Sequence, residues 1–213
     1  SAFTLMTELT QLKKQEQYDW LNLSVAQSLQ QSVVNMDKAF TRFFKQKKGF
    51  PKFKSKHIGT HHVGFPQNTK VDFEAGKVSL PKLGWVKTKI SREFYGNIKT
   101  STIEKTPTNK FFISITVELP DVEVKQKPIS KKNAVGIDTG IKTFATLSDG
   151  SEIENPKHLK NSIQRLKVLQ RRASKKQKGS SNRRKANLKV ALLHEKISNQ
   201  RLDFLHKTTT AIA

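Results

Sequence analysis

The stretch NAVGIDTGIKTFATLSDG, residues 133–150, decides what fold and chemistry to expect of this chain. Small or polar residues alternate with Val135 and Ile137, which is the period of two that a strand shows. We therefore expect Asp138 to project from the end of a buried strand. Residues 144–147 can form its antiparallel partner, and Asp149-Gly150 supplies the turn into a third strand, SEIEN.

Three chemistries use an aspartate set between glycines in this way. Aspartic proteases activate water with Asp-Thr-Gly, sugar-kinase or chaperone-type ATPases place phosphates beside a glycine-rich turn, and ribonuclease-H-like nucleases hold a metal on their first strand. The protease needs a second such loop or a homodimer, because two carboxylates share one proton, and the chain has one Asp-Thr-Gly. Residues 141–144 (IKTF) are bulkier than a phosphate-binding turn prefers. These points rank the ATPase second and the protease last.

The overall charge indicates a polyanionic partner. The 213 residues carry 40 Lys plus Arg against 17 Asp plus Glu, a formal net charge of +23. Such an excess repels itself unless a polyanion screens it, and nucleic acid is favoured over the competing anionic membrane surface. We find no apolar run long enough to span a bilayer and no signal-peptide pattern. Both ends read as cut, so we expect the interior of a longer protein, cytoplasmic in a prokaryote.

Cysteine is absent from the sequence, which excludes disulfide scaffolds and thiolate zinc sites within these residues. Residues 1–46 read as helical, with a break at 18–23 and a capping-box signature at Ser24 and Gln27. Apolar residues then recur at steps of three or four, as on the buried face of an amphipathic helix. The polar face of that helix, which includes Gln27 and Gln30, is where a contact in a DNA groove would lie.

A change of period marks the middle of the chain. GFPKFKSKH, residues 49–57, alternates aromatic and basic residues, which suits either a nucleic-acid strand or a solvated loop anchored by two phenylalanines. Residues 61–119 then show short runs of period two, separated by turn clusters, and predict a small antiparallel barrel or sandwich. Residues 121–132 are polar and contain a proline, as expected of a linker.

The sequence after Pro156 predicts a helical hairpin. One apolar stripe begins at Leu159 and a second begins at Ala186, beyond a Gly-Ser-Ser break. No acidic residue occurs between Asn161 and His194, so the hairpin's one-signed charge predicts phosphate binding. The predicted nucleic-acid backbone contacts here are Arg171, Arg172, Lys175, Lys176, Arg183, Arg184 and Lys185.

Four ordered segments resemble the TnpB-type nucleases of insertion sequences, relatives of the type V CRISPR effectors. GIDTGIKTFATLSDG is similar to the first segment of their RuvC domain, and GFPKFK to their phenylalanine-proline loop. LPKLGWVKTK resembles a strand pair of their barrel, and RLDFLHKTTTAIA the helix that ends their RuvC insertion. Together the segments cover nearly the whole chain, which is more specific than a lone Asp motif.

The resemblance implies an α+β, multidomain chain that binds guide RNA and target DNA. Residues 1–50 would be a helical recognition segment, 51–120 an incomplete wedge-type β-barrel, 121–132 the linker, and 133–213 the first part of an α/β RuvC nuclease domain with the basic hairpin. Such proteins cut DNA beside a short flanking motif. They use a two-metal Mg²⁺ site, to which Asp138 would give the first catalytic carboxylate.

The resemblance also assigns contacts to nucleic acid. Gln30, with Gln27, falls where the family reads its flanking motif, and a glutamine can pair bidentately with adenine. Basic residues of the loop and barrel would hold the nucleic-acid backbone: Lys52, Lys54, Lys87 and Lys89.

The chain departs from a complete nuclease of this family. The family's later Glu, its final Asp and a cysteine-bearing zinc segment have no counterpart in these residues. We therefore expect no DNA cleavage from these residues alone. The first hypothesis is an active RNA-guided endonuclease, and the alternative is a nuclease-dead, RNA-guided repressor.

Overall fold

The computed structural model describes residues 1–53, 60–121 and 134–213, and the chain divides into two compact units. The first unit is Ser1–Asp121 and the second is Val122–Ala213. Each unit combines helices with small antiparallel sheets, so the predicted α+β class is confirmed. Lys54 and the predicted linker, apart from Asp121, lie outside the described residues.

Three helices open the first unit: α1 (Ala2–Leu12), η1 (Glu16–Leu23) and α2 (Ala26–Gln46). The predicted break at 18–23 is instead part of the 3₁₀ helix η1. The predicted capping box is wrong, because the N-cap of α2 is Val25 and carries no side-chain cap. Gln27 does not reach back to close such a box, since its amide donates to Gln67 Oε1 at 2.9 Å.

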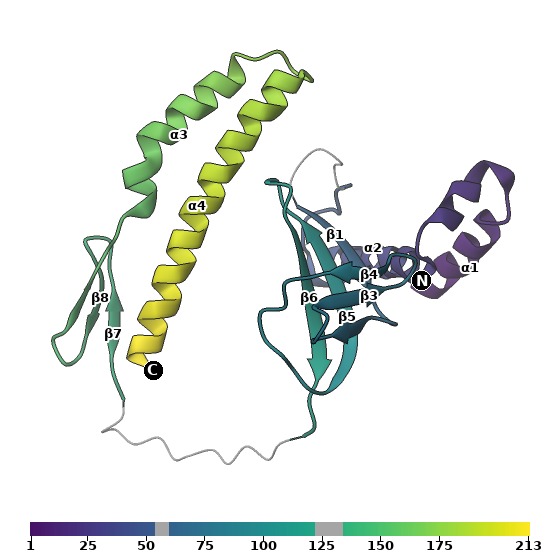
Figure 1. The fold of residues 1–213 in the computed structure, drawn as a ribbon, viewed down its shortest axis with the longest axis horizontal. Helices are drawn as coiled ribbons and strands as arrows, with labels where there is room; N and C mark the ends of the chain where they lie inside the picture. The colour runs from purple at the N-terminus through teal and green to yellow at the C-terminus, as the bar shows by residue number, and fades with distance from the viewer. Residues whose placement is uncertain (54–59, 122–133) are drawn as a thin grey trace. The chain divides into compact units, whose positions relative to one another are not determined.

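Two three-stranded antiparallel sheets follow in the first unit (Figure 1). In the first sheet, β5 (Asn97–Lys105) lies between β1 (His61–Phe65) and β6 (Phe111–Glu118). The second is a meander of β2 (Lys70–Asp72), β3 (Lys77–Leu80) and β4 (Gly84–Lys87). Phe65, Val78 and Leu80 are buried and form the core of the unit, with Val25, Val71, Ile103 and Ile113 packed around them.

The predicted closed barrel is not formed by the described residues. Within them, β1 and β6 each pair with β5 alone, and β2 and β4 each pair with β3 alone. A barrel requires its two outer strands to pair with each other, and neither sheet makes that closing contact. Alternation in a sequence shows which residues face inward, but it does not show which strands pair.

The helices of the first unit are tied to its sheets by polar contacts. Ser28 Oγ of α2 donates to the carbonyl oxygen of Gly64 in β1 at 2.7 Å. Lys82 Nζ, in the turn between β3 and β4, donates to the carbonyl oxygens of Asn22 and Ser24. The start of α2 is therefore fixed against both sheets.

The second unit contains the opening stretch of the sequence. Its sheet has the order β7 (Ile137–Thr139), β8 (Thr143–Leu147) and β9 (Glu152–Glu154), all antiparallel, as predicted. The expectation that the Asp138 strand is buried is wrong. All three residues of β7 are exposed, and Ile137 is 49% exposed. The apolar side chain of Ile137 favours burial, but the described residues contain no second layer that covers this strand.

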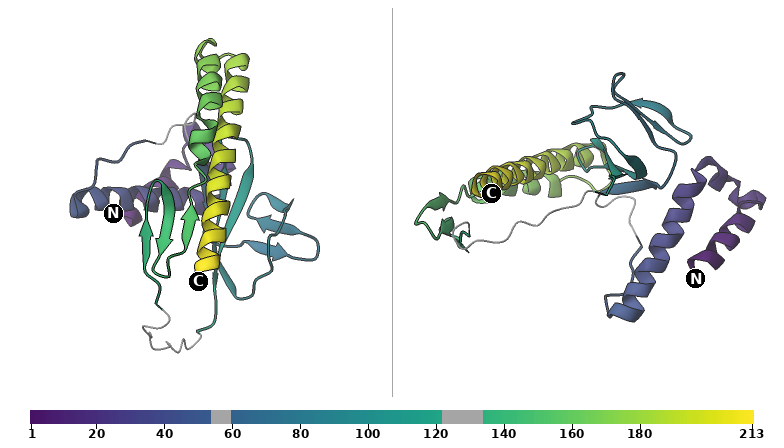
Figure 2. Two further views of the ribbon diagram at one scale, coloured as in Figure 1. Left: turned by 90° about the vertical axis from the view of Figure 1, so that its left-hand side faces the viewer. Right: turned by 90° about the horizontal axis from the view of Figure 1, so that it is seen from below.

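The predicted helical hairpin is confirmed. Helices α3 (His158–Ser174) and α4 (Ser181–Ile212) lie side by side in all views of Figures 1 and 2. Their shared core consists of Leu166, Leu193 and Ile197, with Leu169 and Val190 packed around it. The break between the helices has a clear cause: Gly179 has a φ of 84°, and Ser180 Oγ then caps α4 by accepting from the Arg183 N–H. No helix among the described residues could cross a bilayer.

Candidate metal and nucleic-acid sites

Asp138 occupies the middle of β7, at the edge of the second unit's sheet. Strand pairing places it directly opposite Thr146 of β8. The next row along the strands contains Thr139 and Ala145, and Ala145 is buried. Because neighbouring rows alternate between the faces of a sheet, Asp138 lies on the face opposite buried Ala145. Its side chain is exposed and accessible to a metal ion or a phosphate.

The two glycines that flank Asp138 fix the path of the backbone. Gly136 exchanges two hydrogen bonds with Ser148: its N–H donates to Ser148 Oγ at 3.1 Å, and its carbonyl accepts from the Ser148 N–H at 2.9 Å. A Cβ at Gly140 would lie 2.9 Å from the carbonyl oxygen of Thr143, so a larger residue would force the backbone to move. The motif therefore needs glycine at 140 for close packing in the turn from β7 to β8.

The end of the turn after Asp138 is tied to the helices. Asn155 Nδ2 donates to the carbonyl oxygen of Ile141 at 2.8 Å, and Asn155 Oδ1 accepts from the Lys157 N–H at the start of α3. The Phe144 ring of β8 packs edge-on against Phe204 of α4, with centroids 4.9 Å apart. Sequence reasoning did not identify Asn155 as a positioning residue, and its place just before Pro156 was the available signal.

The described residues fit one ligand of a Mg²⁺ site. Among them, no group of three or more His, Asp or Glu side chains is placed to hold a metal ion. The carboxylate nearest in register is Glu152, opposite Thr146 in β9 and so two strands from Asp138, about 10 Å away by ordinary strand spacing. Mg²⁺ takes one or two carboxylates and completes its shell with water and phosphate oxygens. One exposed aspartate therefore suits a single share of such a site.

Asp149, another acid of the opening stretch, has a structural role. Its Oδ1 accepts from Ser151 Oγ at 2.7 Å and from the Ser151 N–H at 2.9 Å. These hydrogen bonds, the side-chain bond first, lower the pKa of the Asp149 carboxyl below its ordinary 3.8 because they favour the charged form. The carboxylate thus shapes the turn at Gly150, whose φ is 86°, into β9.

The two glutamines predicted to read DNA lie in different environments on α2. Gln30 is exposed, whereas Gln27 is half-buried against the loop that carries Gln67. Gln27 Oε1 is buried and finds no hydrogen-bond partner among the described residues. The structure therefore leaves the side chain of Gln30 accessible and commits the Gln27 amide nitrogen to the fold.

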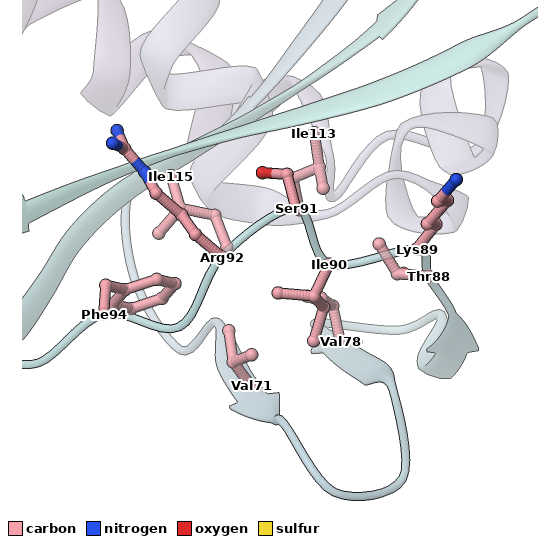
Figure 3. A pocket seen from close by; sticks show the side chains of 10 residues that line it. All are labelled: Val71, Val78, Thr88, Lys89, Ile90, Ser91, Arg92, Phe94, Ile113 and Ile115. Atoms are coloured by element: carbon pink, nitrogen blue, oxygen red, sulfur yellow. The ribbon is translucent and has the colours of Figure 1, made fainter.

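The predicted lysine contacts that the structure describes in the first unit, Lys52, Lys87 and Lys89, lie on the surface. Lys52 is exposed at the edge of a groove of about 1030 Å³ between α2, residues 50–53 and β1. Lys87 ends β4, and Lys89 follows in the segment that closes a smaller cavity of about 210 Å³. Figure 3 shows the charged ends of Lys89 and Arg92 pointing away from the apolar side chains in that cavity. Each charge is therefore available to solvent or to a phosphate.

The hairpin gathers its predicted basic residues around one end. Arg171, Arg172, Lys175 and Lys176 are exposed at the end of α3, and we call these four residues the hairpin tip. Across the break, the exposed members are Arg184 and Lys185, whereas Arg183 is half-buried. Arg183 Nη1 donates to the Lys176 carbonyl oxygen at 2.9 Å, so its guanidinium also holds the connection in place.

Comparison with known proteins agrees with the resemblance found in the sequence. Residues 114–213 match the family OrfB_IS605, described as "Probable transposase". The chain is 37% identical over 205 residues to the "Putative RNA-guided DNA endonuclease InsQ" of Escherichia coli strain K12. It is 33% identical over 207 residues to a "Putative RNA-guided DNA endonuclease" of Streptomyces pristinaespiralis. These matches confirm the resemblance to TnpB-type proteins of insertion sequences. Each alignment covers 96% of the chain, which spans about half the length of these relatives (50%).

Proposed function

We propose that this chain is part of an RNA-guided DNA endonuclease of a transposon, which binds a guide RNA and cuts target DNA beside a short flanking motif. The observation that carries the proposal is the alignment of 96% of the chain with two relatives of that name. The position of Asp138, exposed in β7 of the matched segment, supports it chemically. The net charge of +23 suits a protein that holds RNA and DNA together.

Asp138 is the proposed catalytic residue and the first ligand of a Mg²⁺ pair. When bound, such a pair activates water and stabilises the leaving oxygen of a phosphodiester. The role of this chain in the reaction is to hold the Asp138 carboxylate at a fixed place on the sheet. The hydrogen bonds of Gly136 with Ser148, and of Asn155 with Ile141, fix the backbone on either side of that carboxylate. Its remaining partners would come from outside the described residues.

The other parts take the roles that follow from their surfaces. Residues 1–50 form the recognition segment and 51–120 the wedge segment, joined by 121–132 to the RuvC segment 133–213. Gln30 is the proposed contact to a base of the flanking motif, because its amide is exposed on α2. Lysines of the wedge segment and the hairpin tip hold phosphates, so they set affinity more than sequence choice.

The test uses the product of the complete reading frame that contains this chain, purified with its guide RNA. Asp138→Ala is expected to abolish Mg²⁺-dependent cleavage of a guide-matched DNA while binding of guide and target persists. Glu152→Gln is the matched control, because it neutralises an exposed carboxylate in the same cross-strand row and should leave cutting intact. Undiminished cutting by Asp138→Ala would overturn the assignment. Guide-dependent binding without cutting by the parent protein would instead favour the nuclease-dead repressor.

A further inference from the structure

The β2–β3–β4 sheet has one face directed away from the core, and strand pairing defines its members. Lys70, Ser79 and Trp85 lie opposite one another in one row, and Asp72, Lys77 and Lys87 in another. The row between them contains Val78, which is buried in the core. Because faces alternate along strands, the two outer rows share the opposite, outward face. We call these six residues the Trp85 face: Lys70, Asp72, Lys77, Ser79, Trp85 and Lys87.

Trp85 is an unusual residue for an outward sheet position. It is 54% exposed, and among the described residues no aromatic ring packs against it. Tryptophan gains more from burial than most side chains, so an indole left in solvent forgoes that gain. The ring does not serve the core of the unit, which forms on the other face around Val78 and Leu80. More than half of the surface of Trp85 is therefore accessible to a ligand.

The charge of the Trp85 face specifies the ligand. Lys77 and Lys87 are directly opposite each other across β3 and β4, and like charges at such a pair destabilise a sheet. The only acid in the face is Asp72, whose Oδ1 accepts from the Ala75 N–H at 2.9 Å and so shapes the β2–β3 turn. Within the described residues, no ion pair neutralises Lys70, Lys77 or Lys87. An anion would relieve this repulsion.

We propose that Trp85 stacks on an unpaired nucleobase while the lysines of the Trp85 face bind the phosphates of the same strand. This proposal rests on the proposed function for the presence of nucleic acid, and it adds the single-stranded state of the contacted segment. Aromatic rings and cations together form the usual surface for single strands, because every base has a face that can stack. The row of Lys77 and Lys87 lies about 7 Å from that of Trp85, two residues along the strand, which is within the reach of one nucleotide.

The first experiment compares single-stranded and duplex probes on the 213-residue chain. The probes are a fluorescein-labelled 12-nucleotide uridine RNA, a 12-nucleotide thymidine DNA and a 12-base-pair duplex RNA. Trp85→Ala is expected to weaken binding of one or both single strands by between about 5-fold and about 150-fold, the usual effect of removing one stacking ring. Duplex affinity should stay within about 2-fold, since paired bases are stacked on each other. Trp85→Phe keeps a ring and should recover most of the loss.

The second experiment uses tryptophan fluorescence, for which the chain supplies its own control. It has two tryptophans, and Trp20 is 61% exposed against 54% for Trp85. In Trp20→Phe the signal comes from Trp85 alone, and the uridine or thymidine oligonucleotide should quench it as the base stacks. In Trp85→Phe the signal comes from Trp20 alone and should not be quenched. The two variants differ in which exposed indole remains, so general surface binding would affect both equally.

Each outcome decides between the proposals. If the parent chain binds the probes and Trp85→Ala binds all of them equally well, the stacking proposal is overturned while the proposed function stands. An equal loss for single strands and duplex also overturns it, because a ring that supports only the fold would act on both. If the parent chain binds no probe at low salt, both proposals fail. Quenching of Trp85 by phosphatidylserine vesicles but not by oligonucleotides would assign the face to a membrane surface.

Discussion

Replacing all four residues of the hairpin tip with glutamine should flatten the salt dependence of single-stranded RNA binding by the chain. Each phosphate contacted on a single strand contributes about −0.7 to the slope of log K against log salt. The geometry of α3 limits how many of the four can act at once. Arg171 and the C-cap residue Lys175 lie about 40° apart around the helix axis, whereas Arg172 lies about 100° further round and Lys176 follows the end of the helix. Buried Ala173 faces away from Arg171, so the first pair points away from α4.

This arrangement sets the size of the effect. A strand that follows one pair makes two contacts, and a strand that also meets the flanking pair makes four. The slope should therefore decrease in magnitude by between about 1.4 and about 2.8. Between 50 and 200 mM salt, the parent chain should then lose about 7-fold to about 50-fold more affinity than the variant.

The measurement is fluorescence anisotropy of a labelled RNA titrated at four or more salt concentrations. A matched control removes the same charge from exposed or half-exposed lysines of the first unit: Lys13, Lys14, Lys45 and Lys48. An unchanged slope in the tip variant would show that the tip makes no phosphate contact. An equal decrease in the control would show that total charge, and not the hairpin, sets the salt dependence.

Two smaller predictions concern the stability and electrostatics of the second unit. Leu193→Ala removes a side chain that is 7% exposed in the hairpin core and should lower the free energy of unfolding by about 2–3 kcal/mol, seen as a loss of about 30-fold to 150-fold in hydrogen-exchange protection of α4. The neighbouring Leu192 is 45% exposed, so Leu192→Ala should lower the free energy of unfolding by about 1 kcal/mol. Equal losses would refute the assigned core. Ser151→Ala should raise the pKa of Asp149 towards 3.8 in an NMR titration, because it removes the side-chain hydrogen bond that favours the carboxylate. Protonation of Asp149 should then weaken the turn at a higher pH than in the parent chain. An unchanged pKa would contradict the hydrogen bonds at this turn.

Local patterns in the sequence predicted much of the second unit correctly. The apolar stripes from Leu159 and Ala186 predicted both helices, because helical spacing places their leucines on one face and each helix can bury them only against the other. The Asp149-Gly150 pair predicted the β8–β9 turn, since a carboxylate acceptor and a residue tolerant of positive φ are what that turn uses. In these cases the determining interactions lie within a few residues or between neighbouring elements.

The expectations that failed depend on distant partners. Barrel closure depends on which outer strands pair, and alternation carries no information about pairing. Burial of β7 depends on a covering layer, which the residues around Ile137 do not encode. The capping box at Ser24 failed because the amide of Gln27 instead bonds to Gln67, 40 residues further along the chain. Which lysines contact nucleic acid is likewise decided by a partner, so it stays a prediction.

Charge is segregated within the second unit in a way that suits two different ligands. Residues 134–154, which form the sheet, contain four acids and one lysine. Residues 155–194, which form α3 and the first half of α4, contain thirteen lysines and arginines and no acid. A metal cation is favoured where carboxylates outnumber cations, and a phosphate chain is favoured where the reverse holds. If the hairpin served only to solubilise the unit, mixed charges would have sufficed at less electrostatic cost. One-signed charge beside an acidic sheet instead supports the proposal that the hairpin binds a polyanion and that Asp138 binds a metal.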